Sequence, residues 1–148
     1  MNKKPSEFVK SSYDNNNSLA IDMVSEFLVN KGFSIVDKEE DYWIDIEAER
    51  GGETILFEAE VKTRVRFTSR DSFPFKTVSF LARKSKWKET PFWYVIVCPD
   101  TKYAIFAKSE DIFKDKYIEN INVNTSDRKG MDKFYRVPKS VCIFKKIA

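Results

Sequence analysis

The chain contains no histidine among its 148 residues. This absence excludes catalytic centres that rely on a histidine base and zinc sites that need imidazole ligands. Only four glycines are present, and none of them stands in a glycine-rich motif of the kind that cradles a nucleotide phosphate. A catalytic site in this chain must therefore use carboxylates, lysines, tyrosines or a metal ion that prefers oxygen ligands.

Long apolar runs are also missing: no segment approaches the roughly 20 residues of a membrane span, and the polar N-terminus lacks a signal-peptide core. The cysteines, Cys98 and Cys142, stand in apolar segments, which indicates buried thiols of a reducing compartment rather than a disulfide. We therefore expect a cytoplasmic protein without membrane contact. Length and a hydrophobic content of 42% suit one domain over residues 1–148, with residues 1–16 as a loose arm or a short first helix.

Charge is distributed unevenly along the chain, although the formal net charge is only +3. Residues 37–60 hold ten acids against two bases, and residues 64–88 hold eight bases against one acid. An acidic metal-binding centre beside a basic wall that binds a polyanion is one interpretation. Two solvated surfaces that attract each other are the alternative.

Residues 54–63 are the most informative stretch. They begin apolar and then alternate between polar and apolar side chains, which is typical of a half-buried strand. The alternation places Glu58, Glu60 and Lys62 together on one face of that strand. Two carboxylates and an ammonium group on one short strand face are an unusual arrangement.

A second alternating segment, residues 43–49, precedes this strand and carries Asp45 on its polar face. Gly51 and Gly52 lie between the two segments and strongly indicate a hairpin turn. Depending on the register, the hairpin places Asp45 beside Glu58 or nearer to Glu60.

An aspartate followed, after a strand and a turn, by a glutamate and a lysine two residues apart resembles the PD-(D/E)XK nuclease superfamily. Asp45, Glu60 and Lys62 carry the resemblance, which covers roughly residues 18–106, and Ile44 replaces the proline of the family pattern. The resemblance implies an α/β fold with a restriction endonuclease-like core, in which helices flank a mixed β-sheet.

The resemblance also implies metal-dependent phosphodiester hydrolysis with Mg²⁺ or Mn²⁺. Asp45 and Glu60 would be the carboxylate ligands of this ion, and the carbonyl of Val61 a further ligand. Mg²⁺ prefers such oxygen donors and retains several waters. Lys62 would stabilise negative charge in the transition state, because acting as a base would require a pKa far below its usual value of about 10.4.

Two further acids are open to two interpretations. Glu58 can ligate a second metal ion, or take the place of Glu60 if the strand is shifted. Glu26, on the expected first helix, is an additional ligand by resemblance, whereas burial statistics favour a solvated helix acid. For the strand acids, the alternative is a polar face stabilised by cross-strand pairs.

The basic segment is expected to bind nucleic acid, because lysines can contact phosphates and an aromatic ring can stack on a base. The alternative is a solvated basic edge with the tryptophan packed into the core. The resemblance implies that one of two lysines in this segment, Lys84 or Lys86, also approaches the active site. The expected nucleic-acid-binding residues are Arg64, Arg66, Arg70, Lys84, Lys86, Trp87 and Lys88.

Other segments complete the expected fold. A helix that begins at Asn17 or Ser18 is expected to end at Gly32. Residues 77–82 suit either a strand or the start of a helix. Residues 92–98 form an apolar run typical of a buried central strand, and residues 119–133 are polar enough to predict a surface loop.

The resemblance therefore implies a magnesium-dependent deoxyribonuclease, either structure-selective, as in junction resolution, or weakly specific. DNA is the expected partner because the family mostly cuts DNA, and the resemblance also suggests a homodimer similar to Holliday junction resolvases. A non-catalytic nucleic-acid-binding domain on the same fold and a protein-interaction domain are the alternatives.

Overall fold

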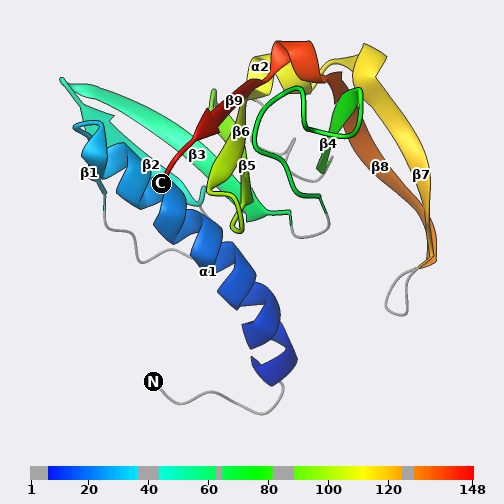
Figure 1. Cartoon of the computed structure of the whole chain (residues 1–148), viewed down its shortest axis with the longest axis horizontal. Coiled ribbons are helices and arrows are strands. Elements are labelled where there is room, and N and C mark those ends of the chain that lie inside the picture. The colour runs from blue at the N-terminus through cyan, green and yellow to red at the C-terminus, as the bar shows by residue number, and fades with distance from the viewer. Residues whose placement is uncertain (1–6, 37–43, 63–64, 82–88, 125–128) are drawn as a thin grey trace.

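The computed structural model describes residues 7–36, 44–62, 65–81, 89–124 and 129–148. Two β-sheets and one long helix make up most of this part of the chain (Figure 1). The elements are α1 (Glu7–Asn30), β1 (Ser34–Ile35), β2 (Ile46–Arg50), β3 (Glu53–Val61), β4 (Thr77–Leu81), β5 (Trp93–Cys98), β6 (Tyr103–Lys108), α2 (Ser109–Ile112), β7 (Ile118–Asn124), β8 (Lys129–Pro138) and β9 (Ile143–Lys146).

The larger sheet has six strands in the order β1-β2-β3-β5-β6-β9. Its neighbouring strands are antiparallel except for β3 and β5, which run parallel. The smaller sheet is antiparallel, with the order β4-β8-β7. The predicted α/β fold with a mixed sheet is therefore confirmed. The prediction had helices flanking the sheet, whereas the structure also contains a second, three-stranded sheet.

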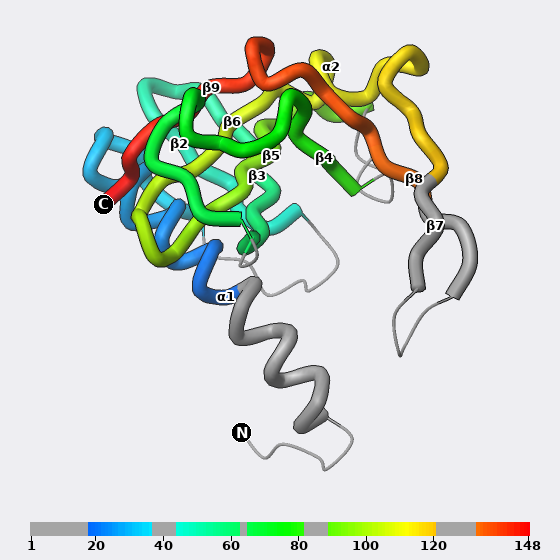
Figure 2. Tube along the Cα trace, turned by 45° about the vertical axis from the view of Figure 1, so that its right-hand side comes forward, coloured from blue at the N-terminus to red at the C-terminus, as the bar shows by residue number. Residues whose placement is uncertain are grey.

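Helix α1 covers one face of the larger sheet, and Figures 1 and 2 show it running alongside that sheet. Its buried side chains Ala20, Val24 and Leu28 follow helical spacing and pack against the sheet. Its expected end is confirmed, because Gly32 follows with a left-handed φ of 92°. Its expected start is wrong: the helix begins at Glu7, so the proposed caps near residue 18 lie inside it. Within the described part of the chain, no helix is both long and apolar enough to cross a bilayer.

The β2–β3 hairpin forms as the sequence predicts. Gly51 and Gly52 have φ values of 59° and 82°, a left-handed conformation that favours glycine and suits a two-residue turn. The turn pairs Arg50 with Glu53, and the ladder continues to Ile46 opposite Phe57.

Strand β5 lies between β3 and β6, and both of its faces are covered. Val95 and Val97 pack in the core beneath α1. Tyr94 and Ile96 point to the opposite face, into a core shared with the smaller sheet. This double burial explains why the sequence of the strand is a continuous apolar run.

The smaller sheet and the loop of residues 65–76 cover this second face. Val78 and Phe80 of β4 and Val137 of β8 are fully buried there. Residues 77–81 are thus a strand, which resolves the open prediction. The predicted surface loop at residues 119–133 is wrong for the residues described, because they pair as β7 and β8. These residues are mostly polar, a composition that predicts a surface loop rather than a strand.

Other local predictions had mixed outcomes. Cys98 and Cys142 are buried free thiols, as expected. Ser109 is the first residue of α2, and its side chain does not cap the helix, whose N-cap residue is Lys108. The buried Ser109 hydroxyl instead accepts a hydrogen bond from the backbone N–H of Phe92 at 3.1 Å.

Replacing Phe80 should test the contact between the two sheets. Its ring is fully buried and packs edge-on against Tyr94, with ring centroids 4.8 Å apart. We expect Phe80→Ala to lower the free energy of unfolding by about 3–5 kcal/mol, measured by urea denaturation. Phe75→Ala is the matched control, because Phe75 is 54% exposed and should change stability little. Equal effects of both variants would contradict the described packing.

Candidate active site

Asp45 is joined to β3 by two hydrogen bonds just before β2 begins, one to Glu58 and one to Ala59. The backbone N–H of Asp45 donates to Glu58 Oε2 at 3.1 Å. The carboxylate of Asp45 in turn accepts the backbone N–H of Ala59 at 3.0 Å through Oδ2. These two bonds hold Asp45 against β3, beside Glu58, which was one of the two registers that the sequence allowed.

Glu58 is only 2% exposed, on the face of the sheet that looks toward β4 and β8. A buried carboxylate is costly unless hydrogen bonds compensate for the water that it loses. The N–H of Asp45 supplies one such bond. Glu58 therefore helps to fix the position of Asp45 through this hydrogen bond.

Glu60 follows on the same face and is half-buried. It is hydrogen-bonded to the hydroxyl of Tyr94, a fully buried residue of the adjacent parallel strand β5. The same hydroxyl accepts the backbone N–H of Leu81 at 3.4 Å. Tyr94 thus links the acid of β3 to the last residue of β4.

The Tyr94 hydroxyl is held in its neutral form. Burial raises its pKa well above 10.0, and the negative charge of Glu60 acts in the same direction. A neutral phenol can donate its proton to a carboxylate. Tyr94 therefore orients Glu60 across the physiological pH range.

Lys62 lies immediately after β3 and is half-buried on the same face as Glu60. Its backbone N–H donates to the carbonyl of Val97 at 2.9 Å, which extends the parallel pairing by one step. Burial lowers the pKa of its amine, while the charge of Glu60 opposes this effect. The structure thus combines an acid and a partly desolvated lysine.

The backbone of Val61 points toward β2 rather than toward β5. The bond from Lys62 to Val97 shows that the even-numbered residues of this segment direct their backbone groups to β5. Odd-numbered residues face the other way, as the bond from Ala59 to Asp45 shows. The Val61 carbonyl consequently faces the side on which Asp45 lies.

These groups fit a hard divalent cation in their chemistry. Continued one step beyond the pair of Ile46 and Phe57, the register of the hairpin sets Asp45 opposite Glu58 and diagonal to Glu60. Over the residues that the structure describes, no group of three or more Cys, Asp or Glu side chains gathers to hold a metal. Mg²⁺ usually needs only one or two carboxylates, with waters and substrate phosphates as its other ligands. Asp45, Glu60 and the Val61 carbonyl meet that requirement.

Glu26 is not brought together with these groups. It is exposed on α1, and α1 covers the sheet face that carries Phe57 and Ala59, opposite to Glu60. This position agrees with the alternative of a solvated helix acid.

Of the predicted nucleic-acid-binding residues, the structure describes Arg66 and Arg70. Arg66 is exposed and lines a cavity of about 210 Å³ that also borders Lys62. Arg70 donates to the carbonyl of Cys142 at 2.7 Å and lies over the Phe144 ring, so its guanidinium group helps to hold the loop against the C-terminal segment. The remaining predicted residues lie outside the described residues: Arg64, Lys84, Lys86, Trp87 and Lys88.

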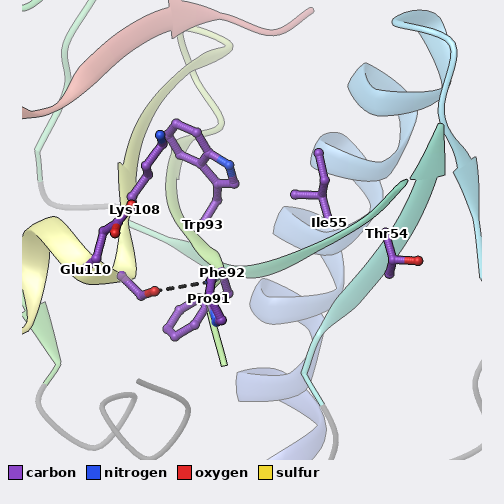
Figure 3. Close-up of a pocket in the computed structure, with 8 residues that line it drawn as sticks. Thr54, Ile55, Pro91, Phe92, Trp93, Lys108 and Glu110 are labelled. Atoms are coloured by element: carbon purple, nitrogen blue, oxygen red, sulfur yellow. Dashed lines mark hydrogen bonds between the residues drawn. The ribbon is translucent and has the colours of Figure 1, made fainter. Parts of the chain in front are cut away.

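A separate cavity of about 260 Å³ lies near the start of β3 and β5. Figure 3 shows Lys108 beside the Trp93 ring, and the ammonium group is 5.4 Å from the ring centroid. Lys62 is seven residues beyond Ile55 of this cavity, roughly 23 Å along an extended strand. This cavity is therefore a separate feature from the carboxylate cluster.

Tyr94 is the site residue that sequence reasoning missed. A tyrosine within an otherwise apolar buried strand was a usable signal, because a buried phenol nearly always needs a hydrogen-bond partner. The partner was not evident without the parallel pairing of Tyr94 with Glu58, which brings β5 beside the acidic strand.

No family model, curated protein or solved structure matches this chain.

The lowered pKa of Lys62 generates a pH-dependent stability prediction. Between the folded-state pKa and the unfolded value near 10.5, the unfolded chain binds more protons at this group, so its contribution to stability rises with pH. Wild type should therefore gain stability relative to Lys62→Met as pH increases toward 10.5. Urea denaturation over this range measures the difference, with Lys146→Met of exposed β9 as a control for the lost charge. A constant difference between wild type and Lys62→Met would contradict the prediction.

Proposed function

We propose that the chain is a metal-dependent nuclease that hydrolyses phosphodiester bonds of DNA, on a restriction endonuclease-like core. The observation that carries the proposal is the double hydrogen bond that holds Asp45 against β3, on the strand that bears Glu60 and Lys62. The hydrogen bonds of Asp45 to Glu58 and Ala59, two residues and one residue before Glu60, support a common site for the residues that carry the resemblance to the PD-(D/E)XK superfamily. The strand order β1-β2-β3-β5, with β3 and β5 parallel, also supports such a core.

Asp45, Glu60 and the carbonyl of Val61 are the proposed ligands of Mg²⁺ or Mn²⁺. The bound ion would neutralise the scissile phosphate and lower the pKa of a bound water. Glu58 holds Asp45 through its backbone N–H. Tyr94 holds Glu60 through its hydroxyl. The protein thus orients both ligands before metal and substrate arrive.

Lys62 has the proposed role of stabilising negative charge on the phosphate. Its partial burial removes water from the amine, and a charge interaction is stronger where water is excluded. The neighbouring carboxylate of Glu60 favours the protonated form and so opposes the effect of burial. This balance is consistent with an electrostatic role for the amine.

Cleavage of labelled DNA tests the proposal. Single-stranded, duplex, flap and four-way-junction substrates are incubated with Mg²⁺ or Mn²⁺, and cleavage products are separated by electrophoresis. We expect wild type to cut, and Lys62→Ala and Glu60→Gln each to reduce the rate by about 100- to 1,000-fold, the cost typical of losing one electrostatic group.

Glu49→Gln and Lys146→Ala are matched controls, because both residues are exposed on strands of the same sheet. They should leave the cleavage rate unchanged. Binding of DNA without cutting by wild type, together with equal binding by Lys62→Ala, would reject catalysis and favour a non-catalytic binding domain.

Tyr94→Phe tests the orientation of Glu60 separately. The variant keeps the ring in the core and removes only the hydroxyl that contacts Glu60 and Leu81. We expect the Mg²⁺ concentration for half-maximal cleavage to rise about 10- to 100-fold, the range typical for loss of a partner that orients a metal ligand. An unchanged metal dependence would exclude this role for Tyr94.

A further inference from the structure

A cavity of about 170 Å³ opens beside Lys62, between the end of β3 and the outer side of β4. It is bordered by Lys62, Phe73, Phe75, Thr77, Ser79 and Arg136. Lys62 is the link between this cavity and the carboxylates of β3. The cavity therefore adjoins the place where the proposed nuclease would hold a scissile phosphate.

Phe75 is an exposed aromatic ring that packs against a buried one. The residue is 54% exposed, yet its ring packs edge-on against Phe73, with centroids 5.9 Å apart. Phe73 is itself buried and packs edge-on against Phe67 and Phe144. A large apolar ring that is anchored in this way and still faces solvent is suited to stacking against a planar ligand.

The opposite side of the cavity is polar. Thr77 and Ser79 alternate with the buried residues Val78 and Phe80, so their hydroxyl groups point away from the core. Ser79 pairs with Arg136 of β8. Hydroxyl and guanidinium groups are the donors that commonly contact phosphate oxygens.

Arg136 is held by an ion pair without being buried. Its Nε lies 3.3 Å from Glu119 Oε2 of β7, and the two side chains are 43% and 52% exposed. Because the ion pair uses Nε, the two terminal nitrogens of the Arg136 guanidinium group can still donate to an anion. Glu119 consequently orients the cation at the rim of the cavity.

We propose that this cavity binds an unpaired nucleotide of the DNA substrate, next to the phosphate held at Lys62. The base would stack on Phe75, and Arg136, Thr77 and Ser79 would contact the adjoining backbone. Away from the ends of a duplex the base faces are already stacked within the helix, so there only an unpaired or extruded nucleotide can use Phe75 in this way. This inference rests on the proposed nuclease function and narrows its substrates to DNA with unpaired segments.

Binding measured without metal tests the inference independently of cleavage. Fluorescence anisotropy in EDTA gives the Kd of wild type and variants for single-stranded, flap and blunt duplex oligonucleotides. Phe75→Ala should weaken binding of single-stranded and flap DNA about tenfold, the effect of losing one stacked base. Duplex binding should stay unchanged, and Phe75→Trp should retain the affinity of wild type.

Ile143→Ala is the matched control, because Ile143 is 48% exposed on β9 and does not border this cavity. It should leave all three affinities unchanged. Oligonucleotides with 2-aminopurine in the unpaired segment provide a second readout: wild type should quench the fluorescence of this base, and Phe75→Ala should not. Equal affinity of Phe75→Ala and wild type for unpaired DNA, or an equal loss on all three substrates, would overturn the inference.

The two proposals can fail separately. If wild type never cuts DNA but the Phe75-dependent preference for unpaired strands persists, the nuclease function is rejected and the nucleotide site is upheld. If cutting depends on Glu60 and Lys62 but duplex and single strands bind equally well with either residue at position 75, the nuclease function is upheld and the nucleotide site is rejected.

Discussion

The exchange of hydrogen bonds between Asp45 and β3 is the contact on which the candidate site depends. It places one carboxylate at the entry to β2 and satisfies a second one, Glu58, that is almost completely buried. A buried acid without such bonds would destabilise the fold. Stability and site geometry therefore share the same two bonds, so a change that disturbs one is expected to disturb the other.

A second constraint comes from the parallel pairing of β3 and β5. Parallel neighbours cannot be joined by a tight turn, so the chain must leave the sheet after Lys62 and return at Trp93. The described part of that excursion includes the loop of residues 65–76 and β4, both of which lie over the acidic face. The chain between β3 and β5 thus covers the second face of the larger sheet, and its residues also line the cavities beside Lys62.

The sequence predicted the part of this arrangement that follows from local pattern. Alternation identified β3 and the face shared by Glu60 and Lys62, and the glycine pair identified the turn. Alternation alone does not determine the register, which the two-residue turn at Gly51 and Gly52 fixes with Asp45 opposite Glu58. Tyr94 and the β7–β8 pairing were missed, because both depend on contacts between segments far apart in the chain or on strands with polar composition.

The hairpin has arms of equal length, and this equality matters for how the sequence can change. Asp45 stands six positions before Gly51, and Glu58 stands six positions after Gly52. A residue gained or lost in one arm would rotate the acid beyond it to the opposite face of the sheet. An insertion in one arm therefore keeps Asp45 opposite Glu58 only when the other arm gains a residue as well. The turn at Gly51 and Gly52 is therefore the reference point that determines which residue of β3 lies opposite Asp45.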